Sequence, residues 1–158
     1  MKSAQLNNAN KEHEMANYDS LKLDNQLCFP LYACAKEIVR QYKPYLDDLD
    51  LTYTQYVTMM VLWENNHLSV KALGKRLYLD SGTLTPLLKK LEAKGYLTRT
   101  RSEADERSVI ISLTDEGLAL RDKALAVPEQ MRGCVRLSKE DAQTLYRILY
   151  QLLGGMTE

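Results

Sequence analysis

The chain has 158 residues, of which 45% are hydrophobic and 27% charged, and its formal net charge is zero. These proportions are typical of a single globular domain, and two full domains would be cramped in this length. No apolar stretch approaches the roughly 18 to 20 residues that a membrane span needs, and the polar N-terminus lacks a signal-peptide core. We therefore expect a cytoplasmic protein that has no membrane partner.

The cysteine and histidine content excludes several classes of site. Three cysteines without a CxxC pair do not fit a secreted disulfide framework or a zinc ribbon. The two histidines, His13 and His67, have no partner at metal-ligand spacing, and the chain lacks a Gly-rich phosphate loop and a GxSxG motif. We therefore expect no metal, no cofactor and no classical catalytic machinery, and any thiol chemistry would be redox or catalytic.

The zero net charge hides an uneven distribution of charge along the chain. Residues 71–107 hold nine basic and five acidic side chains, a net charge of +4, whereas residues 1–70 carry −3 and residues 108–158 carry −1. A local charge of this size suits contact with phosphate groups better than bulk polyanion binding. It also fits an ordinary solvated face, so charge alone leaves both interpretations open.

The N-terminal part predicts a polar tail followed by a long amphipathic helix. Residues 1–20 are polar and favour a mobile tail, and residues 21–158 are expected to form one domain. From Leu27 onward apolar residues recur at steps of three and four, which predicts a helix reaching about Leu49.

Two prolines bear on the ends of this helix. Pro30 is acceptable in a first helical turn, so regular helix is expected to begin near Phe29, with Cys28 at the N-terminal end of the helix. Pro44 is expected to kink or loosen the far end.

The next segment predicts three further helices. Thr52 followed by Gln55 forms a capping-box pattern before a second helix, and Ser69 caps a short one, Val70–Leu77. A turn-like stretch, 79–83, precedes a leucine stripe closed by Gly95.

The N-cap of the leucine-rich helix has two candidates. Asp80 as cap would place Pro86 in the second turn, whereas Thr85 as cap would place this proline at the favoured first position. Both alternatives leave the same polar face.

After Gly95 the apolar period changes to two, which predicts a β-hairpin from Tyr96–Arg101 and Arg107–Leu113. Thr114 is expected to cap a helix that Pro128 interrupts after about Val127, and a final helix is expected over residues 137–153.

This element order predicts a winged helix-turn-helix, mainly α with a small β-hairpin. In such a fold the leucine-rich helix after residues 79–83 enters the DNA major groove, and the hairpin reaches the backbone or minor groove. A step of 100° per residue places small, polar and basic residues opposite the leucines. The candidate DNA-binding residues on the helix and the wing are Ser81, Thr83, Thr85, Lys89, Lys90, Arg99, Arg101, Asp105 and Arg107. Solvated lysines with no DNA role are the alternative.

Two separated motifs resemble a known family. The stretch from Leu79 to Glu92 (LDSGTLTPLLKKLE), the DERSV of the wing, and Leu113-Thr114 with Gly117 resemble the MarR family of bacterial repressors. More narrowly, NQLCFPLY from Asn25 and LTYTQY from Leu51 are similar to its organic-hydroperoxide-sensing branch, the OhrR regulators. The resemblance covers about residues 20–153.

The resemblance implies a redox sensor. In that branch the cysteine of the Leu-Cys-Phe motif senses peroxide, which corresponds here to Cys28, and tyrosines hydrogen-bond it, which implies Tyr42, Tyr53 and, within the same motif, Tyr32. Two-cysteine members carry a resolving cysteine in the partner subunit, which implies Cys134. The chemistry is reasonable, because a thiolate at a helix N-terminus attacks peroxide to give a sulfenic acid.

The other cysteine and the chain ends have simpler interpretations. Cys34 lies six residues after Cys28, about 9 Å of helical rise, so we expect no disulfide between them and assign Cys34 to the core. Leucine-rich helices at both ends, about 24–49 and 115–153, are expected to form a homodimer interface around a winged helix-turn-helix at about 52–113.

We therefore predict a repressor that binds a pseudo-palindromic operator in double-stranded DNA when reduced and is released when organic hydroperoxide, its inducer, oxidises Cys28. Three alternatives remain: a regulator that responds to a non-covalent phenolic or drug-like ligand, a thiol peroxidase-like enzyme, and a protein-binding winged helix. Reversal by reductant would separate the redox sensor from the ligand-responsive regulator, and multiple turnover of peroxide would favour the enzyme. Loss of Lys89, Lys90 and Arg107 without a DNA-binding defect would favour the protein-binding module.

Overall fold

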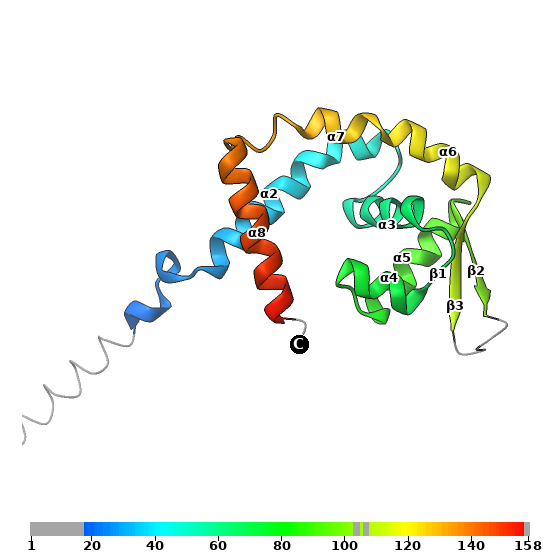
Figure 1. The fold of residues 1–158 in the computed structure, drawn as a ribbon, viewed down its shortest axis with the longest axis horizontal. Coiled ribbons are helices and arrows are strands. Elements are labelled where there is room, and N and C mark those ends of the chain that lie inside the picture. Colours follow the sequence, from blue (N-terminus) through cyan, green and yellow to red (C-terminus); the bar gives the residue numbers. More distant parts are fainter. Residues whose placement is uncertain (1–17, 103–104, 106–107, 157–158) are drawn as a thin grey trace, which may run out of the picture. The chain divides into compact units, whose positions relative to one another are not determined.

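The computed structural model describes residues 18–102, 105 and 108–156, in two compact units divided between Arg40 and Gln41 (Figure 1). The described part of the first unit contains two short turns, η1 (Asp19–Leu21) and η2 (Leu23–Asn25), and the start of helix α2 (Cys28–Asp47). The predicted first helix is thus confirmed, with Cys28 as its first residue, and it continues through Pro44.

The second unit confirms the predicted fold class, because it is mainly helical with one small antiparallel sheet (Figure 1). The elements of this unit after α2 are α3 (Tyr53–Glu64), β1 (Leu68–Ser69), α4 (Val70–Leu77), α5 (Ser81–Ala93), β2 (Leu97–Arg101), β3 (Val109–Leu113), α6 (Asp115–Ala124), α7 (Ala126–Met131) and α8 (Lys139–Met156). The strand order is β1-β3-β2, and Leu97 pairs with Leu113 at one end of the hairpin. Strand β1, which pairs Leu68 with Ile111, was not predicted.

Side-chain caps explain where several of these helices begin. At α3 the Thr52 hydroxyl accepts from the Gln55 amide at 3.3 Å while the Gln55 side chain accepts from the Thr52 amide at 3.0 Å, which is the predicted capping box. Ser69 caps α4 and Thr114 caps α6, each by accepting a backbone amide three residues on. The helix starts are therefore set by local sequence.

Asp80 is the N-cap of α5, which settles the alternative left open above. Its Oδ1 accepts from the Thr83 amide at 2.9 Å, and the helix begins at Ser81. Pro86 lies inside the helix and removes one amide donor in the second turn. Residues 81–83, expected as a turn, are therefore helical.

The prediction that Pro128 ends the helix after Thr114 was wrong. The break lies at Leu125, between α6 and α7, and Pro128 is the third residue of α7. An amide at this position of a first turn has no partner within its helix, so a proline there costs no hydrogen bond.

The core of the second unit fixes the orientation of α5. Leu84, Leu88 and Leu91 along one side of α5 are at most 1% exposed. They belong to a buried cluster that also includes Leu73 of α4 and Ile111 of β3. The opposite side of α5 is thereby held toward solvent.

Helix α8 keeps its apolar side uncovered in the single chain. No residue of α8 is buried, and the four predicted apolar positions, Leu145, Ile148, Leu149 and Leu152, are 36 to 41% exposed. A row of exposed apolar residues along one helix usually marks an interaction surface. Among the helices that the structure describes, none combines the length and apolar character needed to cross a membrane.

The start of α6 yields the first prediction. A Cβ at Gly117 would overlap the carbonyl oxygen of Tyr96, which is backbone and cannot move aside. We expect Gly117→Ala to destabilise the fold by about 3 kcal/mol or more, because overpacking against backbone is costly.

The measurement is urea unfolding followed by circular dichroism. Gly133→Ala is the matched control, because a Cβ there meets nothing within 4 Å. We expect it to change the free energy of unfolding by less than about 1 kcal/mol. Equal stability of the two variants would contradict the close approach at Gly117.

Candidate nucleic-acid interface and sensor residues

The turn between α4 and α5 is tight because it is built around Gly74. Tyr78 adopts a left-handed conformation with φ 54°, and the Leu79 amide donates to the Gly74 carbonyl at 3.0 Å. A Cβ on Gly74 would lie 2.7 Å from the Leu79 carbonyl oxygen. This packing places the start of α5 directly after α4, as a helix-turn-helix requires.

Asp80 organises the first turn of α5. Its carboxylate accepts from the Thr83 amide and, at 2.8 Å, from the Thr83 hydroxyl. These hydrogen bonds from Thr83, the backbone bond first, lower the pKa of Asp80 below its ordinary value. The hydroxyl proton of Thr83 is thus committed to Asp80, and its oxygen is presented outward as an acceptor.

The outer face of α5 is polar and basic, as predicted. Thr85 is exposed, and its hydroxyl donates to the Ser81 carbonyl at 2.7 Å. Lys89 and Lys90 are exposed and form no ion pair with any residue that the structure describes. The predicted helix residues that share this exposed surface are Ser81, Thr83, Thr85, Lys89 and Lys90.

Arg99 of strand β2, in the wing, is paired with Glu92 of α5. Its Nε and Nη2 lie 2.8 and 2.7 Å from Oε2 of Glu92, and the two side chains are only 26% and 37% exposed. This pair joins β2 to α5, so the guanidinium of Arg99 is engaged within the protein. Arg101, at the end of β2, is exposed.

The loop of the wing is only partly described. Asp105 accepts from the Ser108 hydroxyl at 2.7 Å, and its carbonyl accepts from the Ser108 amide at 2.8 Å. Arg107 lies outside the described residues, and so does its predicted contact with Asp105.

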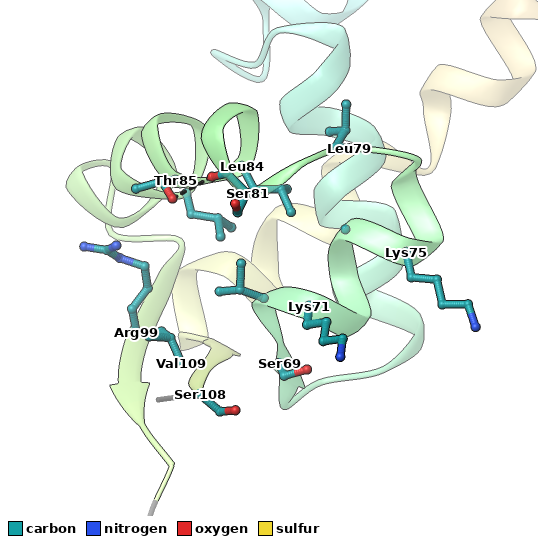
Figure 2. Close-up of a pocket in the computed structure, with 13 residues that line it drawn as sticks. Ser69, Lys71, Lys75, Leu79, Ser81, Leu84, Thr85, Arg99, Ser108 and Val109 are labelled. Atoms are coloured by element: carbon teal, nitrogen blue, oxygen red, sulfur yellow. Dashed lines mark hydrogen bonds between the residues drawn. The ribbon is translucent and has the colours of Figure 1, made fainter. Parts of the chain in front are cut away.

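A groove of about 550 Å³ separates the start of α5 from the wing (Figure 2). Lys71 and Lys75 extend from α4, whereas Arg99 extends from β2 at the opposite side of the view. Hydroxyl groups of Ser69, Ser81, Thr85 and Ser108 also line the groove. Cations and hydroxyls of this kind suit an anion such as a phosphate.

An aromatic cluster in the second unit brings together three predicted sensor residues. The rings of Tyr42 and Tyr53 lie 4.9 Å apart, and Tyr56 lies 6.1 Å from Tyr42. Cys134 packs on the same core and is close enough to Tyr42 to influence its pKa. The structure thus places Tyr42, Tyr53 and Cys134 in one neighbourhood.

Burial raises the pKa values of these tyrosines. It is the main cause of a raised pKa at Tyr42, followed by the neighbouring Tyr53 and Cys134, and it alone raises the pKa of Tyr53. Phenols with raised pKa values keep their protons through the neutral range and act as hydrogen-bond donors.

The remaining predicted sensor residues lie in the first unit. Cys28 begins α2 and is exposed, and Tyr32 is 63% exposed one turn later. Cys34 is also exposed, so its assignment to the core was wrong for the single chain. The apolar stripe that suggested burial is present on α2, but none of the described residues of the first unit, 18–40, buries it.

Three site features were missed by sequence reasoning. Glu92 was not identified as the partner of Arg99, and Tyr56 and Trp63 were not placed beside the sensor tyrosines, although their rings lie 6.4 Å apart in the same cluster. Helical spacing along α3 could have suggested Tyr56, which is three residues after Tyr53. Among the described residues no cluster of potential metal ligands was found.

Comparison with known proteins gives consistent matches. The family described as transcriptional regulator SarA/Rot matches residues 40–123. The organic hydroperoxide resistance transcriptional regulator of Bacillus subtilis is 53% identical over 136 residues, covering 86% of this chain and 92% of that protein.

Solved structures extend the comparison. AbfR of Staphylococcus epidermidis is 33% identical, covers 89% of this chain and 97% of its own, and superposes with a TM-score of 0.68. AbfR has also been solved bound to DNA in reduced and overoxidised forms, each with a TM-score of 0.71. Sco3205 of Streptomyces coelicolor, a MarR family regulator in complex with DNA, covers 87% of this chain and 94% of its own at 22% identity, with a TM-score of 0.78, and so shares the fold.

The tyrosine cluster predicts how stability changes in alkali. A group whose pKa is raised by folding contributes stability below its unfolded pKa, and this contribution is lost as pH rises through the folded value. We therefore expect the thermal midpoint to fall above about pH 10, the model-peptide value of tyrosine. Tyr42→Phe should flatten this decline, measured by circular dichroism between neutral pH and pH 11.

Tyr18→Phe is the control, because Tyr18 is 65% exposed. Its midpoint should follow the wild-type pH dependence. A Tyr42→Phe curve with the wild-type slope would show that the phenol of Tyr42 is not shielded from solvent.

Proposed function

The chain belongs to the MarR family of transcriptional regulators, in the branch of the organic hydroperoxide resistance regulators, and on this premise we propose that it is a redox-sensing repressor. It binds its operator when reduced and is released when organic hydroperoxide oxidises Cys28. The observation that carries the proposal is its 53% identity over 136 residues with a regulator of organic hydroperoxide resistance.

The DNA-binding part of the proposal is supported by α5 and the groove beside it. The exposed face of α5 enters the major groove, where Thr85, Lys89 and Lys90 reach bases and phosphates, while Thr83 lies near the DNA backbone. Ser81 contacts the backbone near the helix start, where amides and the helix dipole favour an anion.

The wing completes the proposed interface. Arg101 is exposed and available to phosphates. For Arg107, two residues after Asp105 and outside the described residues, we propose a contact with the minor groove. Arg99 contributes indirectly, because its pair with Glu92 fixes the wing against α5.

The sensing part of the proposal is a two-step oxidation. The Cys28 thiolate attacks one peroxide oxygen, so that an S–O bond forms, the O–O bond breaks, and the alkoxide leaves and takes a proton to become an alcohol. The Cys134 thiol of the partner subunit then attacks the sulfenic sulfur, which forms a disulfide and releases water. Tyr42, Tyr53 and Tyr32 donate hydrogen bonds to the reacting sulfur and oxygen atoms.

We place this switch in a homodimer. The uncovered apolar residues of α8 and of the first turns of α2 supply the interface, so that residues of about 24–49 and 115–153 dimerise and residues of about 52–113 bind DNA. A twofold dimer matches a pseudo-palindromic operator. Because its ligand is operator DNA, we assign it to the cytoplasm, and we propose no catalytic turnover.

A second candidate is a regulator that responds to a non-covalent phenolic ligand. The groove beside α5 favours it, because its cations and apolar side chains could hold a small aromatic anion. Release by such a ligand would be indifferent to dithiothreitol, whereas release by peroxide would be reversed.

Substitution of Cys28 tests the redox mechanism. We expect Cys28→Ser to bind the operator like the reduced wild type but to stay bound after equimolar cumene hydroperoxide, because serine cannot form a sulfenic acid. Gel-shift titration against DNA upstream of the protein's own gene, beside a non-reducing gel, measures both properties.

The other two cysteines provide the comparison. Cys134→Ser should lose the disulfide-linked dimer band, and Cys34→Ser should behave as wild type in both assays. Release of Cys28→Ser by peroxide would rule out this sensor, and a dimer band that persists without Cys134 would rule out its resolving role.

The proposed phosphate contacts predict a change in salt dependence. Lys89→Gln should lower the slope of log affinity against log salt by about two for a dimer, since each phosphate contact contributes about 0.9. Lys123→Gln is the control, because Lys123 is exposed on α6. Equal slopes for the two variants would remove Lys89 from the interface.

A further inference from the structure

The C-terminal end of α5 is contacted by both segments that lead toward the sensor residues. The helix ends with Lys94 as its C-cap, followed by Gly95 at φ 77° and by Tyr96, whose amide donates to the Leu91 carbonyl at 3.1 Å. We call residues 94–96 the junction. Every contact discussed here lies within the second unit.

The first contact comes from α6. The Thr114 hydroxyl donates to the Gly95 carbonyl at 2.6 Å, and the Thr114 amide donates to the Tyr96 carbonyl at 3.2 Å. Gly117 packs against the same Tyr96 carbonyl without room for a side chain. This contact is made largely by backbone groups, together with the Thr114 hydroxyl, and cannot be removed without disturbing the fold.

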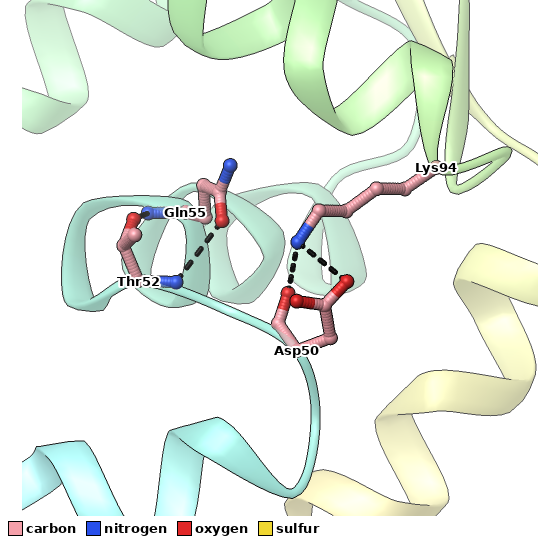
Figure 3. A network of polar contacts seen from close by, with 4 residues as sticks. All are labelled: Asp50, Thr52, Gln55 and Lys94. Atoms are coloured by element: carbon pink, nitrogen blue, oxygen red, sulfur yellow. Dashed lines mark hydrogen bonds and ion pairs between the residues drawn. The ribbon is translucent and has the colours of Figure 1, made fainter.

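The second contact comes from the turn that follows α2 (Figure 3). The Nζ of Lys94 lies 2.8 Å from Oδ2 of Asp50 and also donates to the Asp50 carbonyl. Lys94 is 26% exposed, although it is a lysine on a helix end. Most of the Lys94 side chain is covered where it reaches the turn at Asp50, so it is more restricted than the side chain of an ordinary surface lysine.

The turn itself is anchored in the core. Leu49 and Leu51 on either side of Asp50 are 6% and 5% exposed, and the Leu51 amide donates to the Leu46 carbonyl at 3.0 Å. Asp50 adopts a left-handed conformation with φ 51°, which a non-glycine residue rarely takes. Its position is therefore set by the end of α2 and by its buried neighbours.

Lys94 is engaged by the protein itself. It is the C-cap residue that follows Ala93, the last residue of α5. Its charge is also paired with Asp50. A contribution of Lys94 to operator affinity through direct phosphate contact is therefore not expected.

From this arrangement we propose that the Asp50–Lys94 pair is the positioning contact through which α2 controls the placement of α5. Helix α2 begins at the sensor Cys28 and ends three residues before Asp50, so a displacement of its end is passed to the recognition helix through Lys94. The inference rests on the proposed function, since it requires release on oxidation of Cys28.

The experiment compares operator affinity before and after oxidation in full-length dimers. Lys94→Gln keeps a polar side chain of similar reach and removes the charge. We expect its reduced form to bind within about twofold of wild type, while the ratio of oxidised to reduced Kd falls about fivefold, as for a contact worth up to about 1 kcal/mol.

Three further variants make the result specific. Asp50→Asn keeps the left-handed backbone accessible and should lower the ratio equally, and the double variant should be no worse than either single one. Lys94→Arg keeps the charge and should retain the wild-type ratio. Lys43→Gln is the matched control, because it breaks an exposed pair with Asp47 on α2 that does not reach α5.

The outcomes separate the inference from the function on which it rests. An unchanged ratio in Lys94→Gln, or equal weakening of both redox forms, would overturn the positioning role while leaving the redox switch in place. A wild-type protein that peroxide does not release would overturn the proposed function and this inference with it. Thermal midpoints of all variants verify that each is folded.

Discussion

The close approach of Gly117 to the carbonyl of Tyr96 is the contact on which the second unit depends. It allows α6 to begin directly against the end of the recognition helix, where Thr114 satisfies the carbonyl of Gly95. The indole Nε1 of Trp63 donates to the Gly117 carbonyl at 2.8 Å, which joins α3 to the same point. These contacts join α3, α5 and α6 at one point.

The basic side chains around α5 are of two kinds: some are paired within the protein, and others are exposed to solvent. Arg99 and Lys94 are half-covered and paired with Glu92 and Asp50, so they hold elements in place. Lys89 and Lys90 are exposed on the outer face of α5, where they can replace the counterions of phosphates. A basic segment of this kind therefore gives DNA binding with fewer phosphate contacts than its count of lysines and arginines suggests.

Local rules made the helix boundaries predictable, and non-local contacts were the ones missed. The caps at Thr52, Ser69 and Thr114 depend on residues three positions away, and each was correctly predicted from the sequence. Strand β1 exists only because Leu68 meets Ile111 across 43 positions, which periodicity cannot detect. The predicted helix end at Pro128 was wrong because proline is tolerated in the first turn of a helix as well as after its end.

The candidate site divides in the same way. Cys28 at the start of α2 and the polar face of α5 follow from spacing along single helices. Pairing of Arg99 with Glu92, and of Cys134 with the tyrosine neighbourhood, arises from the tertiary fold. Arg99, a predicted DNA contact, also links the wing to α5 through Glu92. The exposure of Cys34 has a different cause, because an apolar stripe does not indicate whether the same chain or another chain covers it.

The buried tyrosines suit the two charges that peroxide reduction creates. A thiolate carries negative charge before attack and the departing alkoxide carries it afterwards, and a phenol that keeps its proton can donate to either. An ordinary tyrosine is already protonated at neutral pH, and burial raises the pKa of Tyr42 and Tyr53 further, so both phenols keep their protons into the alkaline range. A Cys28–Cys134 bond would then constrain the start of α2 and the segment after α7, which continue to the two contacts at the end of α5. Each tenfold change in affinity corresponds to about 1.4 kcal/mol, so in the proposed mechanism the loss of a few contacts between α5 and DNA accounts for release.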